Sequence, residues 1–150
     1  MKDKLFNLIL PLWIIILIPP FIFLVLFANL IIDGLVIYLT LLFSKISIEK
    51  RNLIILILKA WIFGFVADLI GIVNLILIQD FFNVNAFYAF GSGVDTFAFM
   101  FSILFAGLLI GLFNYYLARK LVDEKVARRI GLSMGIITAP WIFLIPSPLM

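Results

Sequence analysis

Residues 5–43 form one apolar run that carries a single formal charge, Asp33. A membrane-spanning helix needs ~20 apolar residues to cross ~30 Å of hydrocarbon. As one continuous helix this run would be ~58 Å long, about twice that thickness. The run therefore predicts a membrane protein with more than one crossing, and its division decides the topology of the whole chain.

The composition excludes a water-soluble core and most enzyme chemistries. Of the 150 residues, 66% are hydrophobic and 13% are charged, whereas soluble domains are about half apolar and about a quarter charged. The chain contains no Cys and no His, which removes Cys/His metal sites, thiol nucleophiles and the usual general base at neutral pH. We therefore expect no enzyme activity, no cofactor, no metal site and no nucleic-acid partner.

Polar breaks divide the chain into four apolar stretches: 5–43, 53–78, about 96–118 and about 130–149. The breaks differ in charge. Residues 44–52 and 119–129 carry an excess of Lys and Arg, whereas residues 79–95 contain neither and carry Asp80 and Asp95. Because basic loops stay on the cytoplasmic side of a membrane, we expect 44–52 and 119–129 to be cytoplasmic and 79–95 to be outside.

Lys2 and Lys4 decide how the first run crosses. A single crossing would leave both lysines outside, whereas two crossings place them with the other basic segments. Because the apolar run is longer than the ~7–15 apolar residues of a signal peptide, we expect an uncleaved anchor. The sequence thus predicts an all-α membrane protein, a single domain and small bundle with its N-terminus cytoplasmic and its C-terminus outside. The five predicted spans are about 5–18, 21–43, 53–78, 96–118 and 130–149.

Proline placement indicates where the predicted helices turn or bend. Pro19-Pro20 favours a tight hairpin turn between the first two helices, since proline disfavours helix in the preceding residue and suits the first turn of a new helix. The alternative is a turn near Ala28-Asn29, with Asn29 capping the second helix. In the last stretch, Pro140 predicts a kink unless a neighbour satisfies the freed carbonyl group.

Three ionisable residues lie at membrane depth, where charge is costly and a functional role is the default interpretation. They are Asp33, Lys59 and Asp68. Asp33 and Lys59 lie at depths within ~5 Å of each other on adjacent antiparallel helices, so an ion pair between them is expected. Asp68 follows Lys59 by nine residues, which places the two on opposite faces of one helix and leaves Asp68 without a partner.

Asp68 shares a helix face with Ala60, Gly64 and Gly71. Small residues at this spacing suit close helix packing, so the Asp68 carboxyl group is expected to point into a seam between helices. There it could bind and release a proton, or form a hydrogen bond to a neighbouring helix.

Three asparagines, Asn29, Asn74 and Asn114, add amide groups at membrane depth. Hydrogen bonds between helices are their simplest role. Together with Asp68, Asp33 and Lys59, they form the predicted polar, transport-type site.

Two GxxxG spacings occur in apolar sequence, Gly107 with Gly111 and Gly131 with Gly135. Such spacings let helix backbones approach closely. A short basic loop joins the two predicted helices that carry them. Contact between these helices within one chain is the simplest use, and homo-oligomerisation is the alternative.

Two classes of function fit these features. The first is an oligomeric channel or carrier subunit that moves protons, cations or a small solute past Asp68 and Asp33. The second is a non-catalytic accessory, assembly or immunity-type subunit that binds another membrane protein. In either case we expect a cell membrane as the location, with a bacterial cytoplasmic membrane as the setting, and attraction of anionic lipids to the basic residues of 119–129.

Overall fold

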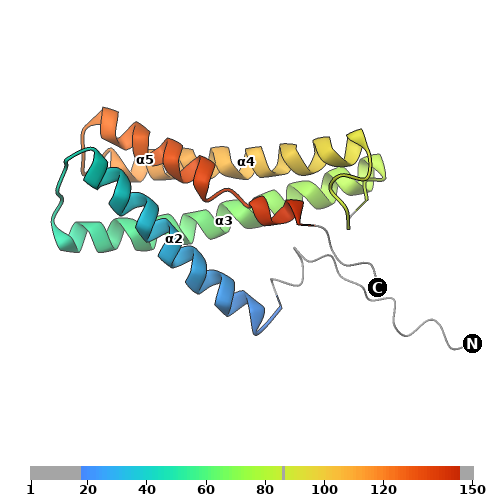
Figure 1. The fold of residues 1–150 in the computed structure, drawn as a ribbon, viewed down its shortest axis with the longest axis horizontal. Helices are drawn as coiled ribbons and strands as arrows, with labels where there is room; N and C mark the ends of the chain where they lie inside the picture. The colour runs from blue at the N-terminus through green and yellow to red at the C-terminus, as the bar shows by residue number, and fades with distance from the viewer. Residues whose placement is uncertain (1–17, 86, 146–150) are drawn as a thin grey trace, which may run out of the picture.

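The computed structural model describes residues 18–85 and 87–145, and this part of the chain is all-helical without strands (Figure 1). Three of its four α-helices, α2, α3 and α4, are long and apolar enough to cross a membrane, as a membrane protein requires. The elements are α2 (Phe21–Phe43), α3 (Lys50–Phe82), α4 (Gly93–Ala118), α5 (Glu124–Ile137) and a 3-10 helix, η1 (Trp141–Leu144).

The helices form an elongated bundle in which α3 and α4 run lengthwise and antiparallel (Figure 1). α5 packs along one half of α4, and α2 crosses α3 and α5 at an angle, so that its N-terminal half leaves the bundle. Loops 44–49 and 119–123 lie at one end, here called the basic end. Residues 83–85 and 87–92 lie at the opposite end, here called the acidic end after Asp80 and Asp95 in the adjoining helix turns.

The apolar helices lie where the sequence predicts them, but two of them are longer. α2 has the predicted bounds, 21–43, and runs without a break through Asn29, so the chain does not turn there. α3 extends the predicted 53–78 at both ends, and α4 begins three residues before the predicted 96. The predicted first helix, 5–18, lies almost entirely outside the described residues, as do Lys2 and Lys4, so the five-span topology stays a prediction.

α5 differs most from the prediction. It begins at Glu124, inside the segment predicted as a loop, because the Asp123 carboxylate caps it by accepting the Val126 N–H at 3.0 Å. It ends at Ile137, before Pro140, and its 14 residues span ~21 Å. The predicted span over 130–149 is therefore a shorter helix followed by η1, and residues 146–149 lie outside the described part.

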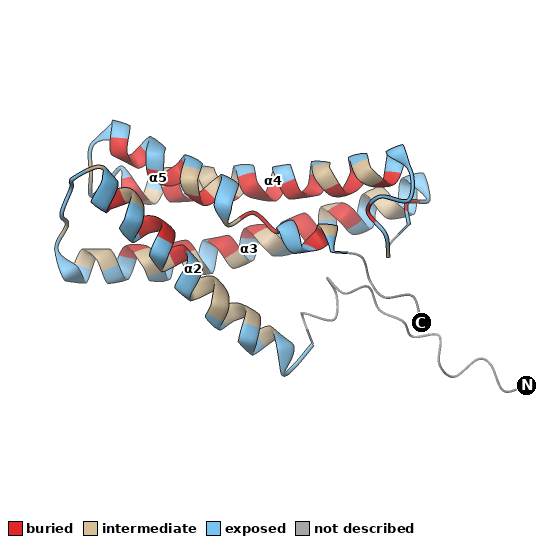
Figure 2. Ribbon diagram, viewed as in Figure 1, coloured by how far each residue is buried: buried red, intermediate tan, exposed pale blue. Residues whose placement is uncertain are grey.

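Buried residues form continuous stripes on the facing sides of the helices (Figure 2). One cluster joins α2, α3, α4 and α5 toward the basic end, and a second joins α3, α4, η1 and the neighbouring loop toward the acidic end. Most of the outward residues are Leu, Ile and Phe that remain exposed. A surface this apolar suits lipid as the surrounding solvent.

Asp95 organises the loop at the acidic end. Its carboxylate accepts the Asn85 N–H at 2.8 Å, and its own N–H donates to the Ser92 hydroxyl at 3.1 Å. These bonds satisfy N–H groups at the start of α4 and across the loop that precedes it. Asp95 therefore has a structural role in holding the loop.

Candidate functional site

Asp33 is a carboxylate buried in the contact between two membrane-type helices. It begins the inward stripe of α2, which continues through Val36, Ile37 and Leu41, and it is only 4% exposed. Across the contact lies Gly64 of α3, where an added Cβ would stand 3.6 Å from an Asp33 carboxylate oxygen. The small residue thus leaves room for the acid in the α2–α3 contact.

Asp68 lies one helical turn beyond Gly64 on the same helix. One of its carboxylate oxygens, Oδ1, is buried and has no hydrogen-bond partner among the described residues. The Asp33 carboxylate is close enough to interact with it electrostatically. Two acids from adjacent helices therefore share one seam, and we call this arrangement the acid pair.

The ion pair predicted between Asp33 and Lys59 is absent from the structure. Among the residues that the structure describes, neither acid forms an ion pair with a basic side chain. Lys59 lies on the exposed side of α3. It is five residues from Gly64, which rotates it ~140° away from the α2 contact and sets it ~7.5 Å along the α3 axis from Gly64. Within residues 18–85 and 87–145, both acids thus lack a paired positive charge.

A cavity of about 270 Å³ opens beside the acid pair, between α2, α3 and the irregular segment that follows α5. Its polar lining includes the Asp68 carboxylate and the Asn29 amide, and most of its other lining side chains are apolar. Asn29 precedes Asp33 by four residues, so one face of α2 carries both. The cavity walls are Val25, Asn29, Phe65, Asp68, Leu69, Ile72 and residues 137–143.

Two tryptophan indoles form hydrogen bonds near this cavity. The Trp61 N–H donates to the Leu26 carbonyl at 2.8 Å and links α3 to the diverging half of α2. The Trp141 N–H donates to the Ile136 carbonyl at 2.8 Å. Because Pro140 has no N–H to reach that carbonyl, the indole takes its place and links η1 to the end of α5.

The other predicted polar residues lie outside the acid pair. Asn74 accepts a hydrogen bond from the Ser102 hydroxyl at 3.0 Å, which joins α3 to α4. Asn114 is fully buried and donates to the Ile110 carbonyl at 2.9 Å, while its amide oxygen has no partner among the described residues. Ser102 was not among the predicted residues, although it lies on a small-residue face of α4 with Ala98 and Ala106 at four-residue spacing.

The two GxxxG pairs face each other within one chain. A Cβ on Gly107 would stand 2.6 Å from the Gly135 carbonyl oxygen, and a Cβ on Gly131 would stand 2.7 Å from that of Gly111. Both distances are below any real Cβ contact. Gly71 of α3 fills a similar role against α4, where an added Cβ would be 2.9 Å from the Ala106 Cβ. These glycines set the close packing of α4 with α5 and with α3.

No protein-family model matches this chain, and no curated protein and no solved structure is similar enough to it to indicate a family. The acid pair is therefore the feature of this chain that bears most directly on its function. Two carboxylates and a nearby amide offer oxygen atoms and exchangeable protons in an otherwise apolar seam. Among the described residues, no group of three or more potential metal-binding side chains accompanies them.

Proposed function

We propose that this protein is a membrane transport subunit in which the acid pair binds a proton or a monovalent cation. The observation that carries the proposal is that the Asp33 side chain and the Oδ1 atom of Asp68 are buried in one seam, with no basic partner among the described residues. Ionisable side chains at membrane depth are costly and usually mark ion or proton pathways. An ion shared between the two carboxylates would offset that cost.

The cavity beside Asp68 supports a route from one side of the membrane. We place the basic end on the cytoplasmic side, because Lys and Arg concentrate in cytoplasmic loops. The cavity then lies in the outer half, with Asp68 at its wall and Asp33 one turn closer to the cytoplasmic side. An ion would enter at Asn29, reach Asp68 and pass to Asp33. A bundle of this size has few helices for a private ion pathway, so we propose that the subunit acts in an oligomer or with a partner.

Ion flux into proteoliposomes tests this function. The purified protein is reconstituted with a pH-sensitive dye for protons, or with a sodium- or potassium-sensitive dye, and flux is compared with Asp68→Asn. The substitution keeps the size of the side chain and removes its charge and its exchangeable proton, so flux is expected to fall to the level of empty vesicles.

Asp80→Asn is the matched control for this experiment. Asp80 is an exposed acid near the end of the same helix, α3, and is expected to leave flux unchanged. Equal flux in the wild type and Asp68→Asn, with both proteins folded, would remove the acid pair from the mechanism.

An accessory subunit that binds another membrane protein is the second candidate. The exposed apolar side chains on the diverging half of α2, among them Phe23, Leu24 and Phe27, favour it. The GxxxG glycines do not, because α4 and α5 already use them against each other. Absence of flux in the wild type, together with loss of a co-purifying partner in Phe23→Ala, would support this second function over transport.

A further inference from the structure

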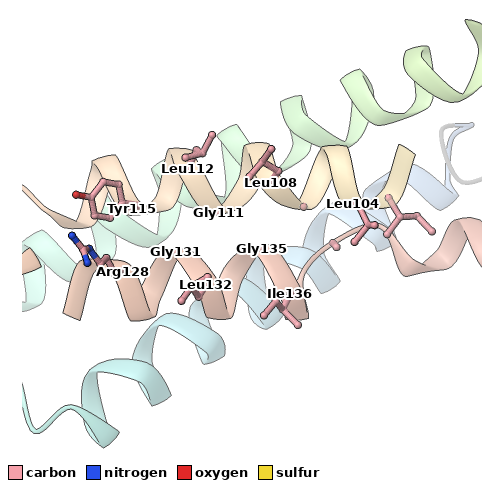
Figure 3. Close-up of a pocket in the computed structure, with 13 residues that line it drawn as sticks. Leu104, Leu108, Gly111, Leu112, Tyr115, Arg128, Gly131, Leu132, Gly135 and Ile136 are labelled. Atoms are coloured by element: carbon pink, nitrogen blue, oxygen red, sulfur yellow. The ribbon is translucent and has the colours of Figure 1, made fainter. Parts of the chain in front are cut away.

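An apolar groove of about 630 Å³ runs along the outside of the α4–α5 contact (Figure 3). Its floor is the line where Gly107, Gly111, Gly131 and Gly135 bring the two backbones together. Because these four glycines have no side chains, the larger side chains next to them on α4 and α5 project beyond the floor and form the two walls of the groove. The walls are Leu104, Leu108 and Leu112 on α4 and Leu132 and Ile136 on α5.

The polar lining residues of the groove lie at one of its ends. Tyr115 of α4 and Arg128 of α5 lie there, with the phenol oxygen and the guanidinium turned toward each other (Figure 3). A second guanidinium, that of Arg119, lies 5.6 Å from the centre of the Tyr115 ring. Two guanidinium groups, Arg128 in the lining and Arg119 beside Tyr115, therefore lie at this end of the groove, whose other lining residues are apolar.

Arg128 keeps donors for a ligand although it already has a partner. It pairs with Glu124 one turn earlier on α5, and the contact uses one of its terminal nitrogens. A guanidinium has five N–H donors, and the Arg128 side chain remains 67% exposed. Residues 119–129 carry five basic and two acidic side chains, so this end attracts anions overall.

The length of the groove matches one leaflet of a bilayer. From Leu104 to Tyr115 the α4 axis rises ~16 Å, and half of the hydrocarbon thickness is ~15 Å. A chain molecule with an anionic head at Arg128 would thus extend to about the bilayer midplane. The basic side chains at one end of the groove are complementary to an anionic lipid headgroup. The apolar remainder of the groove is complementary to an acyl chain.

We propose that the α4–α5 groove binds one acyl chain of an anionic phospholipid, with the headgroup phosphate at Arg128 and Arg119. The occupant is a lipid and not a second copy of this chain. The GxxxG glycines that could pack against a helix of a second copy already pack against each other within the chain. An acyl chain, in contrast, is narrow enough to lie between the leucine walls.

Native mass spectrometry of the full-length, detergent-solubilised protein tests the proposal. Delipidated protein is titrated with phosphatidylglycerol and with phosphatidylcholine of the same acyl chains. The wild type is expected to bind one phosphatidylglycerol per chain several-fold more tightly than phosphatidylcholine. Arg128→Gln should weaken phosphatidylglycerol binding about fivefold, which corresponds to ~1 kcal/mol per basic residue near a membrane. Leu108→Trp fills the groove and should weaken binding of both lipids.

Two matched variants control for general effects. Arg129→Gln removes an adjacent exposed guanidinium that does not line the groove and whose hydrogen bond goes to Ser44. Leu58→Trp adds the same bulk at an exposed position of α3. Both are expected to bind the two lipids as the wild type does. If Leu108→Trp does not fold, Leu132→Trp on the facing wall takes its place.

Three results would overturn the proposal. Equal losses of phosphatidylglycerol affinity in Arg128→Gln and Arg129→Gln would show that the lipid is attracted by surface charge alone. Wild-type lipid binding in both folded groove variants would show that no acyl chain lies in the groove. A wild-type dimer that Leu108→Trp converts to a monomer would show that a second copy occupies it.

Discussion

Replacing Gly135 with alanine places a methyl group in the α4–α5 contact. The added carbon would stand 2.6 Å from the Gly107 carbonyl oxygen and 3.2 and 3.3 Å from backbone atoms of Gly111. All three neighbours are backbone atoms, so no side-chain rotation can relieve the clash. The two helices must move apart or α5 must shift along α4.

The magnitude follows from the size of that displacement. The shortest contact is about 0.8 Å below 3.4 Å, the start of ordinary van der Waals distance, and a gap of ~0.5–1 Å loses a quarter to a half of the dispersion attraction between the atoms that separate. Overpacking of this kind costs ~1–3 kcal/mol. Alanine also favours helix over glycine by ~1 kcal/mol, which opposes the loss.

Gly34→Ala isolates the steric part of this effect. Gly34 also lies inside a helix, and its added Cβ would meet only the Ile57 side chain at 3.5 and 3.8 Å. The helix-propensity gain is then common to both variants. The free energy of unfolding, measured by circular dichroism during titration with a denaturing detergent, is expected to be ~1–3 kcal/mol lower for Gly135→Ala than for Gly34→Ala. Equal stability of the two variants would refute the close packing of α4 and α5.

Three further substitutions test individual hydrogen bonds. Asp123→Ala removes the cap of α5 and should lower the free energy of unfolding by ~0.5–2 kcal/mol in the same titration; an unchanged midpoint would contradict the capping role. Ser102→Ala breaks the hydrogen bond to Asn74 and should lower the free energy of unfolding by ~0.6 kcal/mol, the average for such bonds between membrane helices. An unchanged free energy of unfolding would contradict a stabilising Ser102–Asn74 bond. Asp95→Ala leaves the Asn85 N–H without its acceptor, so amide hydrogen exchange in loop 83–92 should accelerate while exchange in the centre of α4 stays the same.

The existence and type of the long helices could be predicted because uninterrupted apolar sequence has few other solutions. α2, α3 and α4 contain the predicted cores 21–43, 53–78 and 96–118. The ends of α3 were missed because Lys50, Arg51 and Asp80 are polar and were assigned to loops. At 33 residues α3 is ~50 Å long, so its ends extend beyond ~30 Å of hydrocarbon and polar residues there remain helical.

The start of α5 could not be predicted from hydropathy alone. Its first turns contain Glu124, Lys125 and Arg128, which read as a basic loop, yet they form the polar side of a helix whose other side carries Val126 and Ile130. The signal was present in the sequence, since Asp is a preferred N-cap residue and Glu124 after Asp123 puts an acidic residue in the first turn.

The arrangement around the acids depends on helix rotation, which depth along a helix does not determine. The predicted depths put Lys59 within reach of Asp33, but Lys59 lies on the exposed side of α3. The face that meets α2 is the one that carries Gly64, and Asp68 is one turn further along it. The small-residue stripe contained this information, but one sequence does not reveal which neighbouring helix such a stripe contacts.

A flux measurement on single and double variants shows whether Asp33 and Asp68 act as one ion-binding site. Flux into proteoliposomes is compared for the wild type, Asp33→Asn, Asp68→Asn and the double variant, at equal amounts of folded protein. If the acids form one unit, each single substitution is expected to reduce flux as far as both together, because residues that act as a unit are not additive. Wild-type flux in Asp33→Asn, or losses that multiply in the double variant, would contradict a shared site.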